Sequence, residues 1–94
     1  MQIIRDTKYL IKIQSIVEYI AKDSIFRAFD FLDSLDEQIN NLPNMPLKCR
    51  KSIYFDDENI RDLIFKGYVI PYKIDIDKKQ ITIIGINKYK KSMF

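Results

Sequence analysis

The chain has 94 residues, of which 47% are hydrophobic and 13% aromatic, and its formal net charge is +3. This length supports one hydrophobic core, so we expect a single domain over residues 1–94. Apolar and aromatic residues at these levels, with only two glycines and three prolines, exclude a disordered chain and a low-complexity linker.

The sequence also limits where the protein works. It contains no stretch of about 18 apolar residues, so we expect no membrane partner. Lys8 and Lys12 interrupt the N-terminal segment in which a signal peptide would need roughly 7–15 apolar residues. Cys49 is the single cysteine, which excludes an intrachain disulfide and fits a reducing compartment. We therefore expect a cytoplasmic protein.

Charge is distributed unevenly along the chain. Residues 1–47 hold five Lys or Arg against seven Asp or Glu, a net of −2, whereas residues 48–94 hold eleven against six, a net of +5. A basic C-terminal half favours a nucleic acid or an acidic protein as partner. Lysines that only keep the surface hydrated explain the same excess equally well.

The chain begins with a predicted short strand at residues 2–5, and Asp6 or Thr7 can cap the helix that follows. This helix is predicted over residues 8–22, because apolar residues recur there at helical spacing. They are Tyr9, Leu10, Ile13, Ile16, Val17 and Ile20.

Asp23-Ser24 interrupts the pattern and offers a second cap, and another helix is predicted over about residues 25–42. Its acidic side chains lie mostly opposite the apolar stripe. Because the connection is so short, we expect the two helices to form an antiparallel hairpin. The apolar stripe of the second helix consists of Ile25, Ala28, Phe29, Leu32, Leu35, Ile39 and Leu42.

Pro43 and Pro46 end the helical region, and a basic loop over residues 47–55 follows. Three strands are then predicted at residues 59–65, 68–75 and 80–86, separated by turns at Lys66-Gly67 and Asp77-Lys78-Lys79. The order β-α-α-β-β-β predicts an α+β fold, with the helical hairpin packed on one face of an antiparallel sheet. Pro71 lies inside the second of these strands, so it marks either a bulge or an unpaired side.

Three segments, SIFRAFDFLDSLDEQINNL, IRDLIFKGYVIPYKID and ITIIGI, follow one another along the chain. Together they resemble the RelE/ParE superfamily of bacterial toxins. SIFRAFDFLDSLDEQINNL resembles the second helix of that family, and ITIIGI resembles its last core strand. IRDLIFKGYVIPYKID resembles its most characteristic block, with the matching places filled by Arg61, Leu63, Tyr68, Ile70, Tyr72, Ile74 and Asp75. The resemblance covers nearly the whole chain in the right order.

This resemblance implies a sheet in the order 1-4-3-2. It also implies a type II toxin–antitoxin system of the plasmid-stabilisation kind, in which the C-terminal segment of a cognate antitoxin wraps the toxin in a hetero-oligomer. RelE-like members cut mRNA inside the ribosome, whereas ParE-like members poison DNA gyrase. A third kind of relative shares the fold alone. Its expression without an antitoxin would leave cell growth unchanged.

Several departures favour the ParE-like branch. RelE-like cleavage needs basic side chains on the sheet that stabilise the charge developing on the phosphate. Val69, Ile60 and Asp62 stand where that branch carries basic residues, and Asn87 stands where a histidine is frequent. An apolar side chain or a carboxylate cannot stabilise that charge. If the chain is nevertheless an endoribonuclease, the resemblance leaves Arg61, Lys73, Lys88 and Tyr89 as its site.

Other catalytic chemistry has little support in the sequence. There is no histidine, no nucleophile paired with a base, and no glycine-rich phosphate loop, so we expect no cofactor. Asp56, Asp57 and Glu58 are adjacent carboxylates, which are more typical of a solvated turn than of a metal site. We expect no metal.

The functional residues of this chain are therefore expected to bind a partner rather than to catalyse a reaction. For the target they are Arg50, Lys51, Arg61, Lys88, Tyr89, Lys90 and Lys91. Each has a structural alternative: Arg61 can simply pair with Asp62 or Asp75, and the basic C-terminal segment can be a frayed end. Phe26 and Phe31 fall outside the main stripe of the second helix. They either form part of a groove that the antitoxin covers or rest on the first helix.

Overall fold

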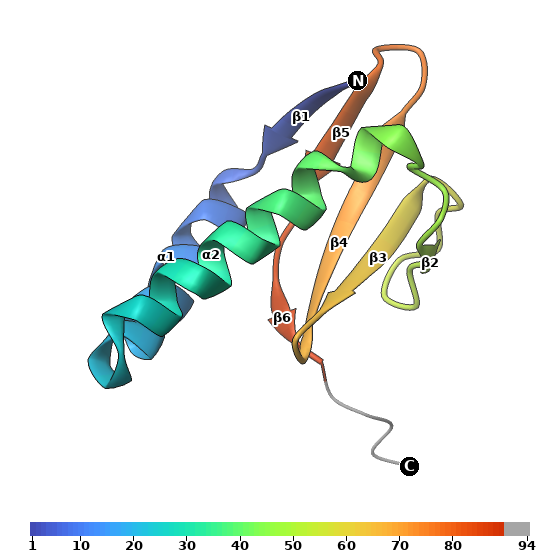
Figure 1. Cartoon of the computed structure of the whole chain (residues 1–94). Coiled ribbons are helices and arrows are strands. Elements are labelled where there is room, and N and C mark those ends of the chain that lie inside the picture. Colours follow the sequence, from blue (N-terminus) through green and yellow to red (C-terminus); the bar gives the residue numbers. More distant parts are fainter. Residues whose placement is uncertain (90–94) are drawn as a thin grey trace.

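The computed structural model describes residues 1–89 and places two helices across one face of a six-stranded sheet (Figure 1). No helix in this part of the chain is long and apolar enough to cross a membrane. A short 3₁₀ helix, Leu42–Asn44, follows the second helix. The other elements, in chain order, are β1 (Gln2–Arg5), α1 (Thr7–Asp23), α2 (Ile25–Asn40), β2 (Arg50–Lys51), β3 (Ile60–Phe65), β4 (Tyr68–Asp75), β5 (Gln80–Ile83) and β6 (Asn87–Lys88).

The helical hairpin forms as expected, and Ser24 is its turning point. Ser24 is both the C-cap of α1 and the N-cap of α2. Its Oγ accepts a hydrogen bond from the Arg27 N–H at 3.3 Å. A serine in this position stabilises a helix by about 1 kcal/mol. Asp6 occupies the corresponding position before α1, but its side chain makes no capping bond.

The strands lie in the order β1-β5-β4-β3-β2, and β6 pairs with β4 beyond the end of β5. The expected order of the four longer strands is therefore correct. The sheet is mixed, however, because β1 runs parallel to β5. The expectation of an antiparallel sheet is wrong for this pair. Tight hairpins make β3, β4 and β5 alternate in direction, so β3 and β5 run the same way. The long helical connection after β1 allows the chain to come back in the direction of β1, and β5 is therefore parallel to β1.

The turn between β3 and β4 is a two-residue hairpin loop at Lys66 and Gly67, as predicted. Both residues have positive φ angles, 45° and 84°. Two positive φ angles give the turn the twist that matches the flanking strands, and glycine adopts such an angle without steric cost. This turn fixes the register of the hairpin, in which Phe65 lies opposite Tyr68.

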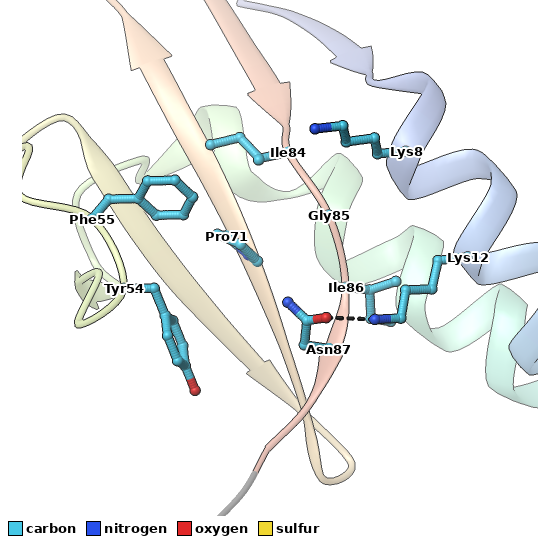
Figure 2. A pocket seen from close by; sticks show the side chains of 9 residues that line it. All are labelled: Lys8, Lys12, Tyr54, Phe55, Pro71, Ile84, Gly85, Ile86 and Asn87. Atoms are coloured by element: carbon cyan, nitrogen blue, oxygen red, sulfur yellow. Dashed lines mark hydrogen bonds between the residues drawn. The ribbon is translucent and has the colours of Figure 1, made fainter.

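Pro71 marks a bulge. Residues 84–86 separate β5 from β6, and opposite them β4 has only Ile70 and Pro71. Figure 2 shows Pro71 beside the segment of Ile84, Gly85 and Ile86. The Ile84 N–H donates to the Pro71 carbonyl at 2.9 Å, so the backbone of Pro71 faces this interruption. The missing N–H of the proline therefore falls where the regular ladder is already broken. The strand predicted over residues 80–86 therefore ends at Ile83, and the prediction is wrong for residues 84–86, which belong to no strand.

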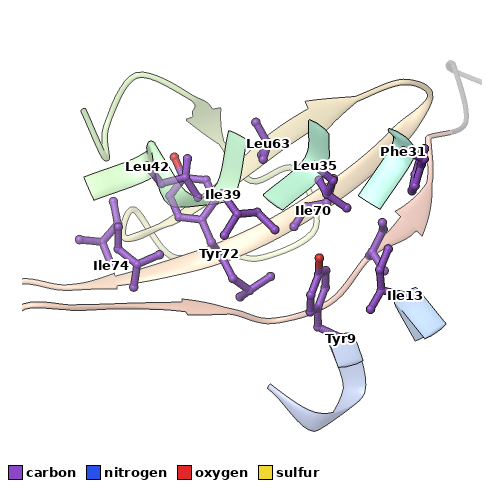
Figure 3. Packing of buried hydrophobic residues seen from close by; sticks show 13 residues of the cluster. Tyr9, Ile13, Phe31, Leu35, Ile39, Leu42, Leu63, Ile70, Tyr72 and Ile74 are labelled. Atoms are coloured by element: carbon purple, nitrogen blue, oxygen red, sulfur yellow. The ribbon is translucent and has the colours of Figure 1, made fainter. Parts of the chain in front are cut away.

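The core lies between the helices and one face of the sheet, called here the helix-covered face (Figure 3). Five of the predicted stripe residues are part of it, and four more pack against it while partly buried: Tyr9, Ile13, Leu35, Ile39 and Leu42, and Ile16, Val17, Ile20 and Leu32. Leu10, Ile25 and Phe29, which were also predicted for the stripes, are 47%, 54% and 57% exposed. The buried side of α2 instead includes Phe31, whose ring centroid lies 5.5 Å from that of Phe65 and 5.6 Å from that of Tyr68. The core comprises Tyr9, Ile13, Phe31, Leu35, Ile39, Leu42, Leu63, Ile70, Tyr72, Ile74, Ile81, Ile83 and Ile86.

The opposite side of the sheet is partly covered by the loop of residues 52–59, and we call it the loop-covered face. Side chains alternate along a strand, so Asp62 and Val69 point away from the helices. Both are only 1% exposed, and Ile60 is 7% exposed. The Ile53 N–H donates to Asp62 Oδ2 at 3.3 Å, which ties the loop to β3. The basic loop predicted before the strands therefore contains β2 and continues into a cover for the sheet.

Candidate functional site

Arg50 in β2 and Tyr89 directly after β6 are brought together although they lie far apart in the sequence. The Arg50 guanidinium lies 5.7 Å from the centroid of the Tyr89 ring, within the range of a cation–π contact. The Tyr89 N–H donates to the Gly67 carbonyl at 2.7 Å, which fixes the chain directly after β6. Two of the predicted target-binding residues therefore form one small basic and aromatic cluster.

Arg50 also has a structural role. Its Nη2 lies 3.5 Å from Oδ2 of Asp62, whose side chain is fully buried. A buried carboxylate is costly unless it is paired and hydrogen-bonded, and Arg50 and the Ile53 N–H supply partners for one of its oxygens. Oδ1 has no hydrogen-bond partner within residues 1–89. Arg50 thus holds the loop-covered face together as well as contacting Tyr89.

Arg61 does not make the ion pairs expected from the sequence. Its Nη1 donates to the Cys49 carbonyl at 3.3 Å, and it pairs with neither Asp62 nor Asp75 among the described residues. The pairing with Asp62 is wrong because neighbours along a strand point to opposite faces. Asp75 instead accepts a hydrogen bond from the Lys78 N–H. Arg61 therefore braces the segment before β2.

The remaining predicted target-binding lysines are dispersed. Lys51 forms an exposed pair with Glu58 at 3.8 Å, the kind of pair that contributes about 0–1 kcal/mol. Lys88 in β6 lies opposite Tyr68 at one end of β4. Lys73 is also in β4, five residues after Tyr68, and at about 3.3 Å per residue it lies roughly 16 Å from Tyr68 along the strand. The four residues proposed for a nuclease site thus do not gather at one point. Lys90 and Lys91 lie outside the described residues.

An exposed apolar surface occupies the end of the helical hairpin where α1 meets α2. Figure 1 shows this end projecting beyond the sheet. Phe26, predicted to contact the antitoxin, is 83% exposed, whereas Phe31 is 7% exposed and has almost no surface to offer. The expectation that Phe31 lies outside the packed side of α2 is wrong. The hairpin surface consists of Tyr19, Ile25, Phe26 and Phe29.

The buried tyrosines hold their protons firmly. Burial and the nearby Asp36 charge together raise the pKa of Tyr9 to about 12, against an opposing effect of the Arg5 charge. Burial also raises the pKa of Tyr72 far above its usual value, and its hydroxyl donates to the Pro46 carbonyl at 2.7 Å. Neither phenol is suited to proton transfer near neutral pH. Asp56, Asp57 and Glu58 do not converge either: across residues 1–89 no three potential ligands are placed to hold a metal ion.

A groove beside the loop-covered face was not foreseen from the sequence. Its volume is about 330 Å³, and Figure 2 shows two lysines of α1 on one side and two aromatic residues of the loop on the other. No periodic signal brings residues 8–12 next to residues 54–55, so only the fold reveals it. The lining comprises Lys8, Lys12, Tyr54, Phe55, Pro71, Ile84, Gly85, Ile86 and Asn87.

Comparison with known families identifies the family of the protein. Residues 4–93 match the family model described as "ParE toxin of type II toxin-antitoxin system, parDE". The chain belongs to the ParE toxin family. The match spans nearly the whole sequence, so it includes the hairpin surface, the Arg50–Tyr89 cluster and the groove. Among curated protein sequences, none matches this ParE-family chain.

Solved structures support the fold of this ParE-family member. A chain from the chromosomal ParDE TA system of P. aeruginosa superposes with a TM-score of 0.75 at 16% identity, covering 96% of this chain and 97% of that one. The isolated E. coli RelE toxin superposes with a TM-score of 0.66 at 15% identity, covering 98% of this chain and 87% of that one. At such low identities the likeness establishes the shared fold alone.

Proposed function

We propose that this ParE-family chain is a toxin that inhibits DNA gyrase by binding to it, and that a cognate antitoxin neutralises it. The family match over residues 4–93 carries the proposal. The resemblance to ParE-like toxins supplies gyrase as the target and the antitoxin as the partner. The loop-covered face supports a mechanism of binding rather than catalysis.

The argument against RNA cleavage starts from three positions. Ile60, Asp62 and Val69 stand where RelE-like toxins carry basic residues, and they are 7%, 1% and 1% exposed. None of them is a cation, and the loop of residues 52–59 is hydrogen-bonded to Ile60 and Asp62. Stabilising a phosphate transition state needs donors that reach the developing charge. A face filled in this way favours recognition of a macromolecule.

The hairpin surface suits the antitoxin. Its four large apolar side chains are between 54% and 83% exposed, and a cluster of this kind usually marks a protein interface. An apolar segment of the antitoxin would cover Phe26 and Phe29, and the exposed carboxylates farther along α2 would contact basic residues of the same partner. Covering this surface would also stabilise the small toxin, because a ligand that binds only the folded state adds to its stability.

Induced expression in bacterial cells tests the proposal. Cells that produce the chain without antitoxin should stop replicating their DNA and mount an SOS response, and co-expression of the antitoxin should restore growth. The antitoxin is sought in the neighbouring reading frame, as a short gene for a DNA-binding protein. Arrested growth without an SOS response, together with cuts in mRNA positioned by codon, would argue for ribosome-dependent cleavage instead.

A further inference from the structure

The groove between α1 and the loop of residues 52–59 has walls of opposite character. On one wall, Lys8 and Lys12 are four residues apart and so lie on the same side of the helix. On the other wall, Tyr54 and Phe55 leave 53% and 40% of their surfaces exposed. A cationic wall and an aromatic wall facing each other define what kind of ligand fits between them.

The positive charge on the lysine wall is not neutralised by the described residues. Lys12 Nζ donates to the neutral Asn87 Oδ1 (Figure 2), and Lys8 forms no ion pair with any residue of 1–89. A carboxylate placed between the two ammonium groups would gain two charge-assisted hydrogen bonds. The lysine wall is therefore complementary to an anionic group.

The floor of the groove is open. Pro71 and Gly85 line it at the bulge between β5 and β6, and a Cβ atom built at Gly85 meets nothing within 4 Å. A volume of about 330 Å³ is at the lower end of the range for binding pockets and accommodates a few side chains. The groove thus suits a short segment rather than a long continuous strand.

The charges around the aromatic wall decide between two classes of partner. Asp56, Asp57 and Glu58 follow Phe55 directly and lie in the loop that carries the aromatic wall. A nucleic-acid strand has a phosphate at every nucleotide, so several of its charges would meet these carboxylates. A protein segment can place a carboxylate at the lysines and an apolar side chain at the aromatics.

We infer that this groove binds an acidic and apolar segment of the target protein, with a carboxylate between Lys8 and Lys12 and an apolar side chain against Tyr54 and Phe55. The inference deepens the proposed function and rests on the chain being a toxin with a protein target. It assigns target recognition to the groove, while the hairpin surface remains for the antitoxin. Toxicity and antitoxin binding therefore depend on separate residues.

The test compares two doubly charge-reversed variants of the full chain. Lys8→Glu/Lys12→Glu changes the groove, and Lys22→Glu/Lys78→Glu makes the same change in net charge at two exposed lysines elsewhere. The groove variant should lose toxicity in cells and inhibit purified gyrase at least about tenfold more weakly than the control variant does. Unchanged antitoxin affinity would show that the groove variant is folded.

A third variant tests the groove by bulk alone. Gly85→Leu adds a side chain where a Cβ meets no other atom, so it should obstruct the groove without disturbing the backbone. This variant should also lose toxicity while it keeps its affinity for the antitoxin. Toxicity retained in both Lys8→Glu/Lys12→Glu and Gly85→Leu would overturn the inference.

The remaining outcomes separate the inference from the proposed function. If the wild-type chain is toxic but leaves gyrase active, gyrase is not the target, and the groove inference is decided by the toxicity of the variants. A wild-type chain that is harmless in cells overturns both. Binding of a labelled 20-nucleotide DNA strand that the groove variant loses and the control keeps, measured by fluorescence anisotropy, would assign the groove to nucleic acid and overturn the inference.

Discussion

The two faces of the sheet are buried by different means. The helix-covered face is closed by the hairpin, and its core is apolar apart from the hydroxyl groups of Tyr9 and Tyr72. The loop-covered face is closed by an irregular segment that is tied down by the buried carboxylate of Asp62. Dispersed apolar contacts stabilise the first face, whereas the second depends on a few directed bonds. We therefore assign stability to the helix-covered face and recognition to the loop-covered face.

This difference also explains the position of the groove. A face packed by two helices has little free surface, because strand side chains that point to it, such as Leu63, Ile70 and Ile81, are buried in the core. A loop leaves gaps at its margins, and here the gap lies beside a bulge where the ladder between β4 and its neighbours is interrupted. Binding residues commonly lie on loops that are held in place by a rigid scaffold.

The largest expected effect is on the helix-covered face. Leu35 is 0% exposed, so Leu35→Ala should lower the free energy of unfolding by about 2–5 kcal/mol, through lost apolar burial and a remaining cavity. Leu47→Ala, at a position 57% exposed in the loop before β2, is the matched control and should change it by less than about 0.5 kcal/mol. Urea denaturation measures both values. Equal effects would remove the basis for assigning stability to the helices.

The second expected effect is a loss of stability at alkaline pH. The folded-state pKa of Tyr9 is raised to about 12, above its ordinary value of 10.0. The unfolded chain therefore releases this proton first, so the stabilisation is fully present below pH 10 and is lost as the pH rises toward 12. The slope from one such group is about 1.4 kcal/mol per pH unit. Tyr72 contributes in the same direction.

Tyr9→Phe isolates the contribution of Tyr9. The Tyr9 hydroxyl is buried without a hydrogen-bond partner in the described residues, so its removal should leave stability at pH 7 unchanged or slightly higher. Between pH 10 and 12 the variant should lose less stability than the wild type does. Urea titrations at several pH values measure both. Identical alkaline slopes for the two proteins would contradict the burial of this phenol.

The smallest of these effects concerns the loop-covered face. Asp62→Asn keeps the shape of the side chain but weakens its bonds to Arg50 and the Ile53 N–H, and should cost about 1–2 kcal/mol. Amide hydrogen exchange should become faster in residues 52–59 and stay unchanged in α2. Asp77→Asn, in the exposed turn between β4 and β5, is the control. Unaltered protection of the loop would show that Asp62 does not hold it.

Much of the fold follows from periodic patterns in the sequence. The helices of residues 7–23 and 25–40 and the strands of residues 60–65 and 68–75 were predicted to within two residues, because apolar side chains recur along them with a regular spacing. The error at Phe31 arose because the buried side of α2 is rotated from the predicted stripe, which exposes Phe29 and buries Phe31. Such a rotation depends on the partner element and leaves little trace in the helix itself.

The candidate site was predicted less completely, for a physical reason. Phe26 and Arg50 are exposed and Tyr89 is half-buried, so all three are accessible to a partner. The contact between Arg50 and Tyr89, however, joins residues far apart in the sequence. The cover formed by residues 52–59 and the approach of Lys8 to Tyr54 depend on how an irregular loop folds back. No periodic pattern encodes that path, so neither the loop-covered face nor its groove was predicted.

One measurement tests the central claim most directly, that this ParE-family chain acts by binding and not by cutting RNA. Purified chain is titrated in parallel into a gyrase supercoiling reaction and into a reaction of translating ribosomes whose mRNA is mapped by primer extension. Loss of supercoiling with intact mRNA is the predicted result. Normal supercoiling at every concentration, with mRNA cut at positions set by the codons, would contradict the account.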